Sequence, residues 1–467
     1  MPVTQTSVAL STVPAPAALT GLPLVLAQLR AFIQTTPGKL RLWQLGGIAL
    51  TLLFGLSVWN YDRYVSSVAR TMTTDTVPSI VSAETLRTQL SNANASMVNA
   101  FLTKNMDPQS SDWVAYRNAV HAAQQSYFEA AQNITFGDTE RKPLFEVMSG
   151  LEDYDRLVGG ALDKGQFSDD VITADRLMQD RILPAAVALD QANYSVLDEV
   201  YGSFKSRHML HSIMMFVCGF ALATYLIYAQ LFLRRQSNRL FNPGLLAATL
   251  VFGIGSFGLM LCSSHAGAAL QSAKEDAFDS LHMLAKAKAV AYAANTDESM
   301  FLLVSGNAAL QADSDKQFRL RALAIEAPKG TSVPADNSLV KSQGYLRDEL
   351  NNLTFEGEEA LAQKTLTAWE LYMAVDGRIR QLEHSGQHAQ AVKLDLGHDK
   401  GESNWAFGQF DAALDQVTAL NHTEFKSRGA SATRNIARLV YVELALVLLV
   451  SAAIFFGFKP RLDEYRF

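Results

Sequence analysis

The stretch LHSIMMFVCGFALATYLIYAQLFL, residues 210–233, decides the fold. It contains no Lys, Arg, Asp or Glu, and the basic segment RRQSNRLFN, residues 234–242, follows it directly. The hydrocarbon core of a bilayer is about 30 Å thick, and a helix of roughly 20 apolar residues crosses it. We therefore predict a transmembrane helix at 210–233.

Three further apolar stretches of this kind lie at 42–59, 243–262 and 439–458. A buried helix of a soluble protein would explain one such stretch, but four in one chain favour membrane spans. Hydrophobic residues make up 49% of the 467-residue chain and charged residues 18%, and the apolar excess lies in these blocks. The net charge of −6 offers no basic face for nucleic acid.

Basic residues beside the spans predict the orientation. Segments 1–41, 234–242 and 459–467 share one side of the membrane, and each is net positive. Short loops rich in Lys and Arg face the cytoplasm. We therefore predict a multi-pass plasma-membrane protein with both termini cytoplasmic, a disordered arm at 1–41, a basic loop at 234–242 and a tail at 459–467. The long segments 60–208 and 263–436 are then extracytoplasmic.

Segment 60–208 shows helical periodicity throughout. Apolar residues recur at steps of three and four, the period of a helix that faces a bundle; they are Trp113, Tyr116, Val120, Ala123, Tyr127, Ala130 and Ile134. A second stripe comprises Leu144, Met148, Leu151, Asp155, Val158 and Leu162. Breaks at NMDPQSSD, NITFGDT and DKGQFSD leave four helices, which predicts an antiparallel four-helix bundle.

Two prolines lie inside the long helices of this segment. They are Pro78 and Pro184. Proline has no N–H group and its ring clashes with the preceding turn, so both are expected to kink or interrupt their helices.

The second long segment, 263–436, follows the same plan with a longer loop, IEAPKGTSVPADNS. Both segments contain ALDQ, at Ala188–Gln191 and Ala413–Gln416, and then FKSR, at Phe204–Arg207 and Phe425–Arg428. We interpret the chain as a duplicated unit of span, four-helix bundle and span, giving an all-α membrane protein. Chance similarity between two amphipathic segments is the alternative.

Polar and small residues within the spans are the next feature. Glu443 lies in the fourth span, where an acid costs about 2.5–3.5 kcal/mol at mid-depth. We name Glu443 and His211 as a candidate intramembrane polar pair, with His265 as a second candidate partner. The alternative is a hydrated Glu443 near the surface.

Small residues that permit close helix packing occur in spans one and three; they are Gly46, Gly47, Gly253, Gly255 and Gly258.

Motifs of enzymes and cofactors do not occur in the sequence. It contains no GxxxxGK[ST] loop, HExxH, CxxC or HRD. We therefore expect no enzyme activity, no catalytic residue, no cofactor and no metal. The turn with His384, His388 and His398 is interpreted as solvated rather than as a metal site. The cysteines, Cys218 and Cys262, both lie in apolar blocks, so no disulfide stabilises the long segments.

Five segments carry a resemblance to a known family. They are TPGKLRLW (36–43), NANASMVNAFL (92–102), RLMQDRILPAA (176–186), FNPGLLAATL (241–250) and AANTDESMFLL (293–303). Together they resemble the four-pass, GlnX-like membrane transducers of actinobacteria, whose outer segments resemble the four-helix sensor domains of chemotaxis receptors. The resemblance implies an extracytoplasmic solute-binding protein and a cytoplasmic serine/threonine kinase as partners.

These observations favour a membrane sensor that relays an outside signal to a separate cytoplasmic protein. The predicted cytoplasmic segments are too short to bury a core of their own. Arg234, Arg235 and Arg239 are the candidate contacts for that partner, and a homodimer is expected from receptors of similar build. A scaffold of the envelope is the alternative, and a transporter is a third hypothesis. The sequence does not identify ligand-binding residues; Arg117, Arg141, Arg156 and Arg176 are interpreted as surface ion-pair partners.

Overall fold

The structure is a computed structural model that describes residues 34–134, 137–165, 167–237, 242–327 and 344–465. Within these ranges the chain forms helices joined by turns and short loops, and no strand occurs. The predicted all-α fold is confirmed. Residues 1–33 of the predicted arm, most of the loop IEAPKGTSVPADNS, Arg239 and the last two residues lie outside the described residues.

Within the described residues, four helical stretches are long and apolar enough to cross a membrane. They are Thr36–Thr103, Asp169–Gln236, Pro243–Leu303 and Ser403–Asp463. Each contains one predicted span and extends well beyond it, as expected for spans that continue into long helical segments. The protein is therefore a multi-pass membrane protein.

The described residues form two compact units. One, the apolar unit, comprises the described residues within 1–60, 211–259 and 440–467; the other, the helical unit, comprises those within 61–210 and 260–439. Four helices contribute to the apolar unit: α2 (Thr36–Arg70), α7 (Leu183–Ser237), α8 (Pro243–Gln271) and α14 (Ser403–Asp463). The helical unit holds both long segments together.

Glycines bring the four helices of the apolar unit close together. A Cβ atom at Gly244 of α8 would lie 2.4 Å from the Gly457 Cα of α14, and one at Gly255 would lie 2.5 Å from Leu446. Gly46 is similarly close to Tyr225, whose hydroxyl donates to the Trp43 carbonyl at 2.8 Å.

Not every predicted glycine has this role. Gly46, Gly47 and Gly255 do, but nothing lies within 4 Å of a Cβ atom built at Gly253 or Gly258. For those two positions the close-packing interpretation was wrong. They lie on parts of α8 that no neighbouring helix approaches closely.

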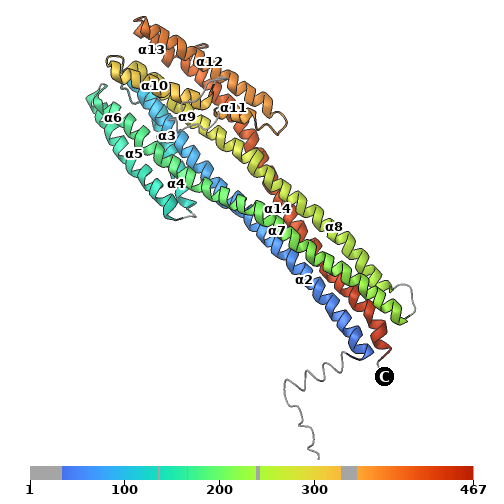
Figure 1. The fold of residues 1–467 in the computed structure, drawn as a ribbon. Helices are drawn as coiled ribbons and strands as arrows, with labels where there is room; N and C mark the ends of the chain where they lie inside the picture. The colour runs from blue at the N-terminus through green and yellow to red at the C-terminus, as the bar shows by residue number, and fades with distance from the viewer. Residues whose placement is uncertain (1–33, 135–136, 166, 238–241, 328–343, 466–467) are drawn as a thin grey trace, which may run out of the picture. The chain divides into compact units, whose positions relative to one another are not determined.

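The first long segment contributes one core of the helical unit. After α2 follow η1 (Thr71–Thr76), α3 (Val77–Thr103), α4 (Ser111–Gln132), α5 (Asp138–Lys164), α6 (Asp169–Leu177) and η2 (Met178–Ile182), and then α7. The helix ends lie at the three predicted breaks. In Figure 1, α3, α4, α5 and α6 run side by side, and they share one apolar core.

The periodicity located one buried face correctly and the other only in part. On α4, Trp113, Tyr116, Ala123 and Ala130 are buried as predicted. On α5 the buried face comprises Leu144, Val147, Tyr154, Val158 and Ala161. The predicted members Met148 and Asp155 are exposed. The face is displaced because Tyr154 points inward, where its hydroxyl donates to Asn94 Oδ1 at 3.1 Å.

The second long segment builds the other core. It comprises η3 (Ser272–Phe278), α9 (Asp279–Leu303), α10 (Ala308–Ile325), α11 (Tyr345–Leu350), α12 (Glu358–His384) and α13 (His388–Leu396), followed by α14. The short helices α11 and α13 were not predicted. Each core includes residues from the other segment: Met300 and Val304 of the second segment pack into the first core, and Leu102 of the first segment packs into the second core. The central helices α3 and α9 lie against each other (Figure 1).

In the part of the chain that the structure describes, three π-helical segments lie within or next to the long helices. η1 ends just before Pro78, and η2 ends just before Pro184. Proline cannot donate the backbone hydrogen bond of a regular helix, and the wider turn of a π segment accommodates this loss. Each proline therefore interrupts the regular α-helical hydrogen bonding, as predicted, although the helix continues beyond it. The third, η3, precedes α9 as η1 precedes α3, but no proline marks it.

Candidate functional site

The central helices α3 and α9 are buried along most of their length. A helix buried on all sides is ordinarily apolar all round. These two helices instead carry many buried polar residues; on α9 these are Ser280, His282, Asn295, Thr296, Asp297, Glu298 and Ser299. Buried polar groups need partners inside the protein. The functional chemistry of the helical unit is therefore expected along this pair.

The first site is the Glu84 cluster, which we define as Glu84 of α3, Asp190 of α7 and His282 of α9. All three are buried, with 3%, 2% and 5% of their surface exposed. His282 Nδ1 lies 3.6 Å from Glu84 Oε1 and 3.6 Å from Asp190 Oδ1. Both ring nitrogens, both Glu84 oxygens and Asp190 Oδ1 have no hydrogen-bond partner among the described residues.

Aromatic neighbours fix the imidazole ring in this cluster. The ring stacks on Tyr194, with centroids 4.6 Å apart and planes inclined by 10°, and on Phe278, with centroids 5.9 Å apart. Tyr194 lies one turn after Asp190 on α7, and Phe278 lies one turn before His282. The same turns that supply the polar groups therefore hold the ring in place.

Burial shifts the protonation of all three groups toward their neutral forms. It raises the pKa of Glu84, and together with the negative charge of Glu84 it raises the pKa of Asp190 to about 8. Burial, followed by the positive charge of Lys286, lowers the pKa of His282 to about 2. Each unpartnered buried group costs about 1–3 kcal/mol. The Glu84 cluster brings several such groups together in one place.

A cavity of about 190 Å³ adjoins the Glu84 cluster. Glu84 and His282 line it, together with Lys288 of α9 and Asp415 of α14. Lys288 Nζ lies 2.5 Å from Asp415 Oδ1 and 3.1 Å from Asp411 Oδ1. Asp190 and Asp415 are the aspartates of the two ALDQ motifs. Both therefore face charged or titratable groups of α9.

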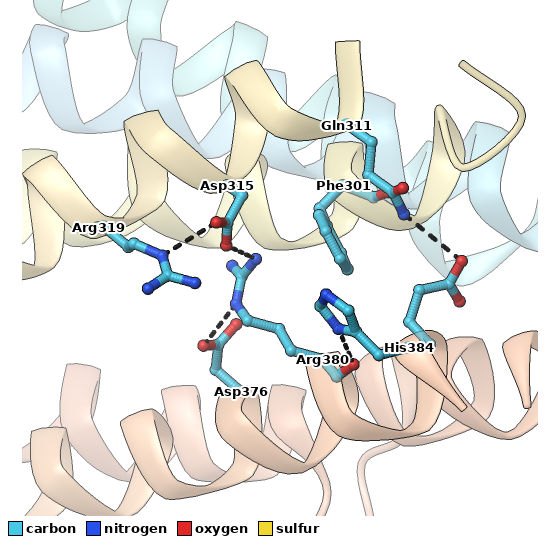
Figure 2. A network of polar contacts seen from close by, with 8 residues as sticks. Phe301, Gln311, Asp315, Arg319, Asp376, Arg380 and His384 are labelled. Atoms are coloured by element: carbon cyan, nitrogen blue, oxygen red, sulfur yellow. Dashed lines mark hydrogen bonds and ion pairs between the residues drawn. The ribbon is translucent and has the colours of Figure 1, made fainter. Parts of the chain in front are cut away.

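The second polar site is the Arg380 network, shown in Figure 2. It links Arg380 of α12 to Asp376 of the same helix and to Asp315 of α10. The guanidinium group lies between two rings, 4.6 Å from the centroid of Phe301 and 4.4 Å from that of Phe318. The planar cation thus packs against aromatic faces while its N–H groups bind carboxylates. The network joins α9, α10 and α12.

Buried carboxyl groups continue the polar interior beyond Arg380. Glu298 of α9 accepts hydrogen bonds from the hydroxyls of Tyr372 at 2.8 Å and Ser403 at 2.9 Å. Asp395 of α13 accepts one from Ser299 at 3.1 Å. Burial raises the pKa of Asp395 to about 7. Burial and then the negative charge of Asp395 raise the pKa of Glu298.

A larger cavity of about 530 Å³ lies between η1, the start of α3 and α14. Val77, Pro78 and Phe425 supply apolar surface, and His422 and Lys426 supply polar groups. Burial, followed by the charge of Lys426, lowers the pKa of His422. The cavity borders the π segment η1, because Thr73 is part of its wall.

The predicted pair of the fourth span lies within the apolar unit. Glu443 is buried, with 7% of its surface exposed, and His211 is half-buried. A Cβ atom at Gly55 would lie 3.5 Å from Glu443 Oε1, so α2 passes directly beside this carboxyl group. The pairing of Glu443 with His211 stays a prediction. His265 Nδ1 lies 2.8 Å from the carbonyl oxygen of Leu261 in its own helix.

The predicted partner contacts lie at the end of α7. Arg234 and Arg235 are exposed in its last turn, and Arg239 lies outside the described residues. Arg234 also lines a cavity of about 160 Å³ with Arg461 and Pro460 of α14. Their role as contacts stays a prediction.

The histidine-rich turn does not bring its three side chains into a metal-ligating group among the described residues. His384 Nδ1 lies 2.6 Å from the Arg380 carbonyl oxygen, and His388 Nδ1 lies 2.8 Å from Glu383 Oε2. Of the four outward arginines, Arg156 pairs with Asp153 at 2.6 Å on the surface, and Arg117 donates to the Pro108 carbonyl oxygen at 2.6 Å. Surface ion pairing of Arg141 and Arg176 stays a prediction.

Sequence reasoning missed Glu84 and His282. The Glu84 cluster draws one residue from each of three helices that are far apart in the chain, so no spacing rule brings them together. One signal was present, since Asp190 belongs to the repeated ALDQ. A histidine among the apolar residues of DSLHMLAKAKAV was the other.

Comparison with protein families gives a match to part of the chain. Residues 68–202 match the model of an actinobacterial sensor domain. This range includes Glu84 and Asp190, and it supports the predicted resemblance to an actinobacterial sensor family; the closer relation to GlnX-like transducers stays a prediction. Searches of the curated proteins and of the solved structures found no match.

The Arg380 network generates a stability prediction. Replacing Arg380 with Ala leaves Asp376 buried without its cation, and breaking a buried pair in this way costs about 3–5 kcal/mol. Thermal unfolding of the detergent-solubilised protein is therefore expected to begin at clearly lower temperature in R380A. Arg378→Ala, two residues away on the exposed face of α12, is the control. Equal unfolding temperatures for the two variants would contradict the assignment.

A second prediction concerns pH. Asp395 has a folded-state pKa of about 7, above its usual value near 4, so its folded form holds a proton that the unfolded form releases. Its contribution to stability is complete below pH 4 and is lost as the pH rises through 7. Asp395→Asn is expected to flatten this part of the profile of unfolding temperature against pH. The exposed Asp399→Asn should reproduce the wild-type profile; a wild-type profile for D395N would refute the assignment.

Proposed function

We propose, from the match of residues 68–202 to an actinobacterial sensor domain, that this multi-pass membrane protein is a sensor and signal transducer. In this proposal the helical unit lies outside the cell and detects a small molecule or a solute-binding protein. A separate cytoplasmic protein receives the signal. The match to a sensor domain is the observation that carries the proposal.

Helix continuity supports the relay step. The helix α7 runs without interruption from Leu183 to Ser237, and α14 runs from Ser403 to Asp463. Each contributes residues to both compact units. A shift of such a helix along its axis is a known form of signalling motion, with amplitudes of about 1–2 Å.

The π segments support the same step. Two of them lie in the other two long helical stretches, η1 between α2 and α3 and η3 between α8 and α9, and the third, η2, lies between α6 and the start of α7. π segments within α-helices often occur at functional sites because their hydrogen bonding can rearrange locally. We propose that η1 and η3 let their two stretches shift along the helix axes while α7, from Leu183 onward, and α14 move as rigid bodies.

The orientation and the partners complete the proposal. Basic residues in the short segments support a cytoplasmic position for them and an extracytoplasmic position for the long segments. A cytoplasmic serine/threonine kinase, an extracytoplasmic solute-binding protein and a second copy of the chain are the proposed partners. The family resemblance is the support for the first two. We propose no enzyme activity for the chain itself.

The orientation is testable by labelling single cysteines in intact cells. After replacement of Cys218 and Cys262, cysteines are placed at the exposed positions Lys142, Lys400 and Gln236. A membrane-impermeant maleimide should label K142C and K400C directly, and Q236C only after permeabilisation. Labelling of K142C and K400C from opposite sides would refute the proposed topology.

The sensing step is tested by crosslinking within the apolar unit. A Cβ atom at Gly219 of α7 would lie 3.2 Å from the Phe54 ring of α2, so cysteines at these positions report on the register of the two helices. Oxidative crosslinking rates are measured in membranes with a panel of amino acids and divalent cations. We expect one class of compound to change the rate at least twofold. Rates that respond to no compound and to no copurifying protein would count against sensing.

A scaffold is the second candidate function, and one observation favours it. Large apolar side chains are exposed on α4 and α5, namely Phe128 at 63%, Phe145 at 60% and Met148 at 48%. Tyr127 beside Phe128 contacts Met148 Sδ at 3.6 Å, so these residues gather where the two helices meet. Exposed apolar groups of this kind are typical of docking surfaces. Unchanged crosslinking together with a stable copurifying protein would favour this function.

A further inference from the structure

The Glu84 cluster has the composition of a metal site. Glu84, Asp190 and His282 each offer one ligand atom, and these atoms all lie within 4.8 Å of one another. Carboxylate oxygen and imidazole nitrogen are the donors that Zn²⁺ and its neighbours in the first transition row accept. Zinc sites that keep one coordination position open have three protein ligands, and here three different helices supply one ligand each.

The donor distances fit a small divalent cation. Zn–N and Zn–O bonds of about 2.0–2.2 Å at tetrahedral angles place neighbouring donors about 3.3–3.6 Å apart. His282 Nδ1 is 3.6 Å from Glu84 Oε1 and 3.6 Å from Asp190 Oδ1. These separations are too long for hydrogen bonds but suit two bonds to a shared ion. Little movement of the side chains is needed to complete the site.

The lack of partners is the second, independent observation. Glu84, Asp190 and His282 are more than nine-tenths buried, and the atoms that face one another have no hydrogen-bond partner among the residues that the structure describes. Buried polar groups in folded proteins are ordinarily paired, and each exception requires an explanation. A cation bound between them satisfies all three groups at once.

We propose that Glu84, Asp190 and His282 bind one divalent transition-metal ion of the Zn²⁺ class. The fourth position of the ion faces the adjoining cavity of about 190 Å³, which Glu84 and His282 line. The side chains of Thr88 and Gln89 line the same cavity and supply polar surface for a water molecule or a small ligand on the ion. The site does not depend on the chain being a sensor.

Positive charges near the cluster set the strength of binding. Those that face it belong to Arg87, with Nη1 3.8 Å from Glu84 Oε2, and to Lys274 and Lys286. They repel a cation but also favour ionised carboxylates. The net result is expected to be a site that exchanges its ion.

The test uses the full chain, purified in detergent without a polyhistidine tag and treated with a chelator. Zn²⁺ binding is measured by calorimetry and by metal analysis after gel filtration, and Co²⁺ is added as a spectroscopic probe. We expect one Zn²⁺ per chain and Co²⁺ absorption bands of a four-coordinate N/O site. Failure to bind either ion stoichiometrically would overturn the proposal.

Variants assign the ion to the cluster. Glu84→Gln, Asp190→Asn and His282→Ala are each expected to weaken Zn²⁺ binding at least tenfold. The first two keep the size and the neutral form of the buried groups, so they remain informative if H282A does not fold. Asp399→Asn and His398→Ala, both on the surface, are controls that should bind as the wild type does.

The variant results separate this proposal from the sensor function. Wild-type affinity in E84Q and D190N would refute the site, whatever the crosslinking experiment shows. Tight Zn²⁺ binding without any change in the crosslinking rate would instead establish the metal site and count against metal sensing.

Discussion

The burial of α3 and α9 against each other is the constraint on which the helical unit depends. Neither helix has a face left for water along most of its length, so every polar side chain on them needs a partner inside the protein. Arg380 binds Asp376 and Asp315, and Asn94 binds Tyr154 and Asp175. These networks specify how the surrounding helices pack. An apolar interior of the same size would leave the positions of α10 and α12 less determined.

The same constraint joins the two long segments. Arg321 of α10 forms an ion pair with Asp297 of α9, and its other nitrogen donates to Gln179 of η2 at 2.8 Å. Met300 and Val304 complete the apolar core of the first segment. A change in either segment therefore alters groups that the other segment holds, because the two share their interior rather than meeting at a wet surface.

Much of the fold could be predicted from the sequence because its signals are local. Apolar length marks the four spans, Gly, Asp and Pro mark the helix ends, and Pro78 and Pro184 mark two π segments. The third π segment, η3, has no such residue and could be inferred only from its place in the repeated order of elements. The buried face of α5 was misplaced since the inward Tyr154 depends on a hydrogen bond to another helix.

The candidate site could not be predicted in this way, for a physical reason. Glu84, Asp190 and His282 come together only after α3, α7 and α9 have packed, and each has a different sequence context. The repeated ALDQ indicates which aspartates matter but not what they face. In the structure Asp190 faces His282 at 3.6 Å, and Asp415 faces Lys288 at 2.5 Å. The two copies of one motif thus have different chemistry, because one is opposite an imidazole and the other opposite an ammonium group. If the chain arose by duplication, the halves have diverged at the position where the Glu84 cluster lies.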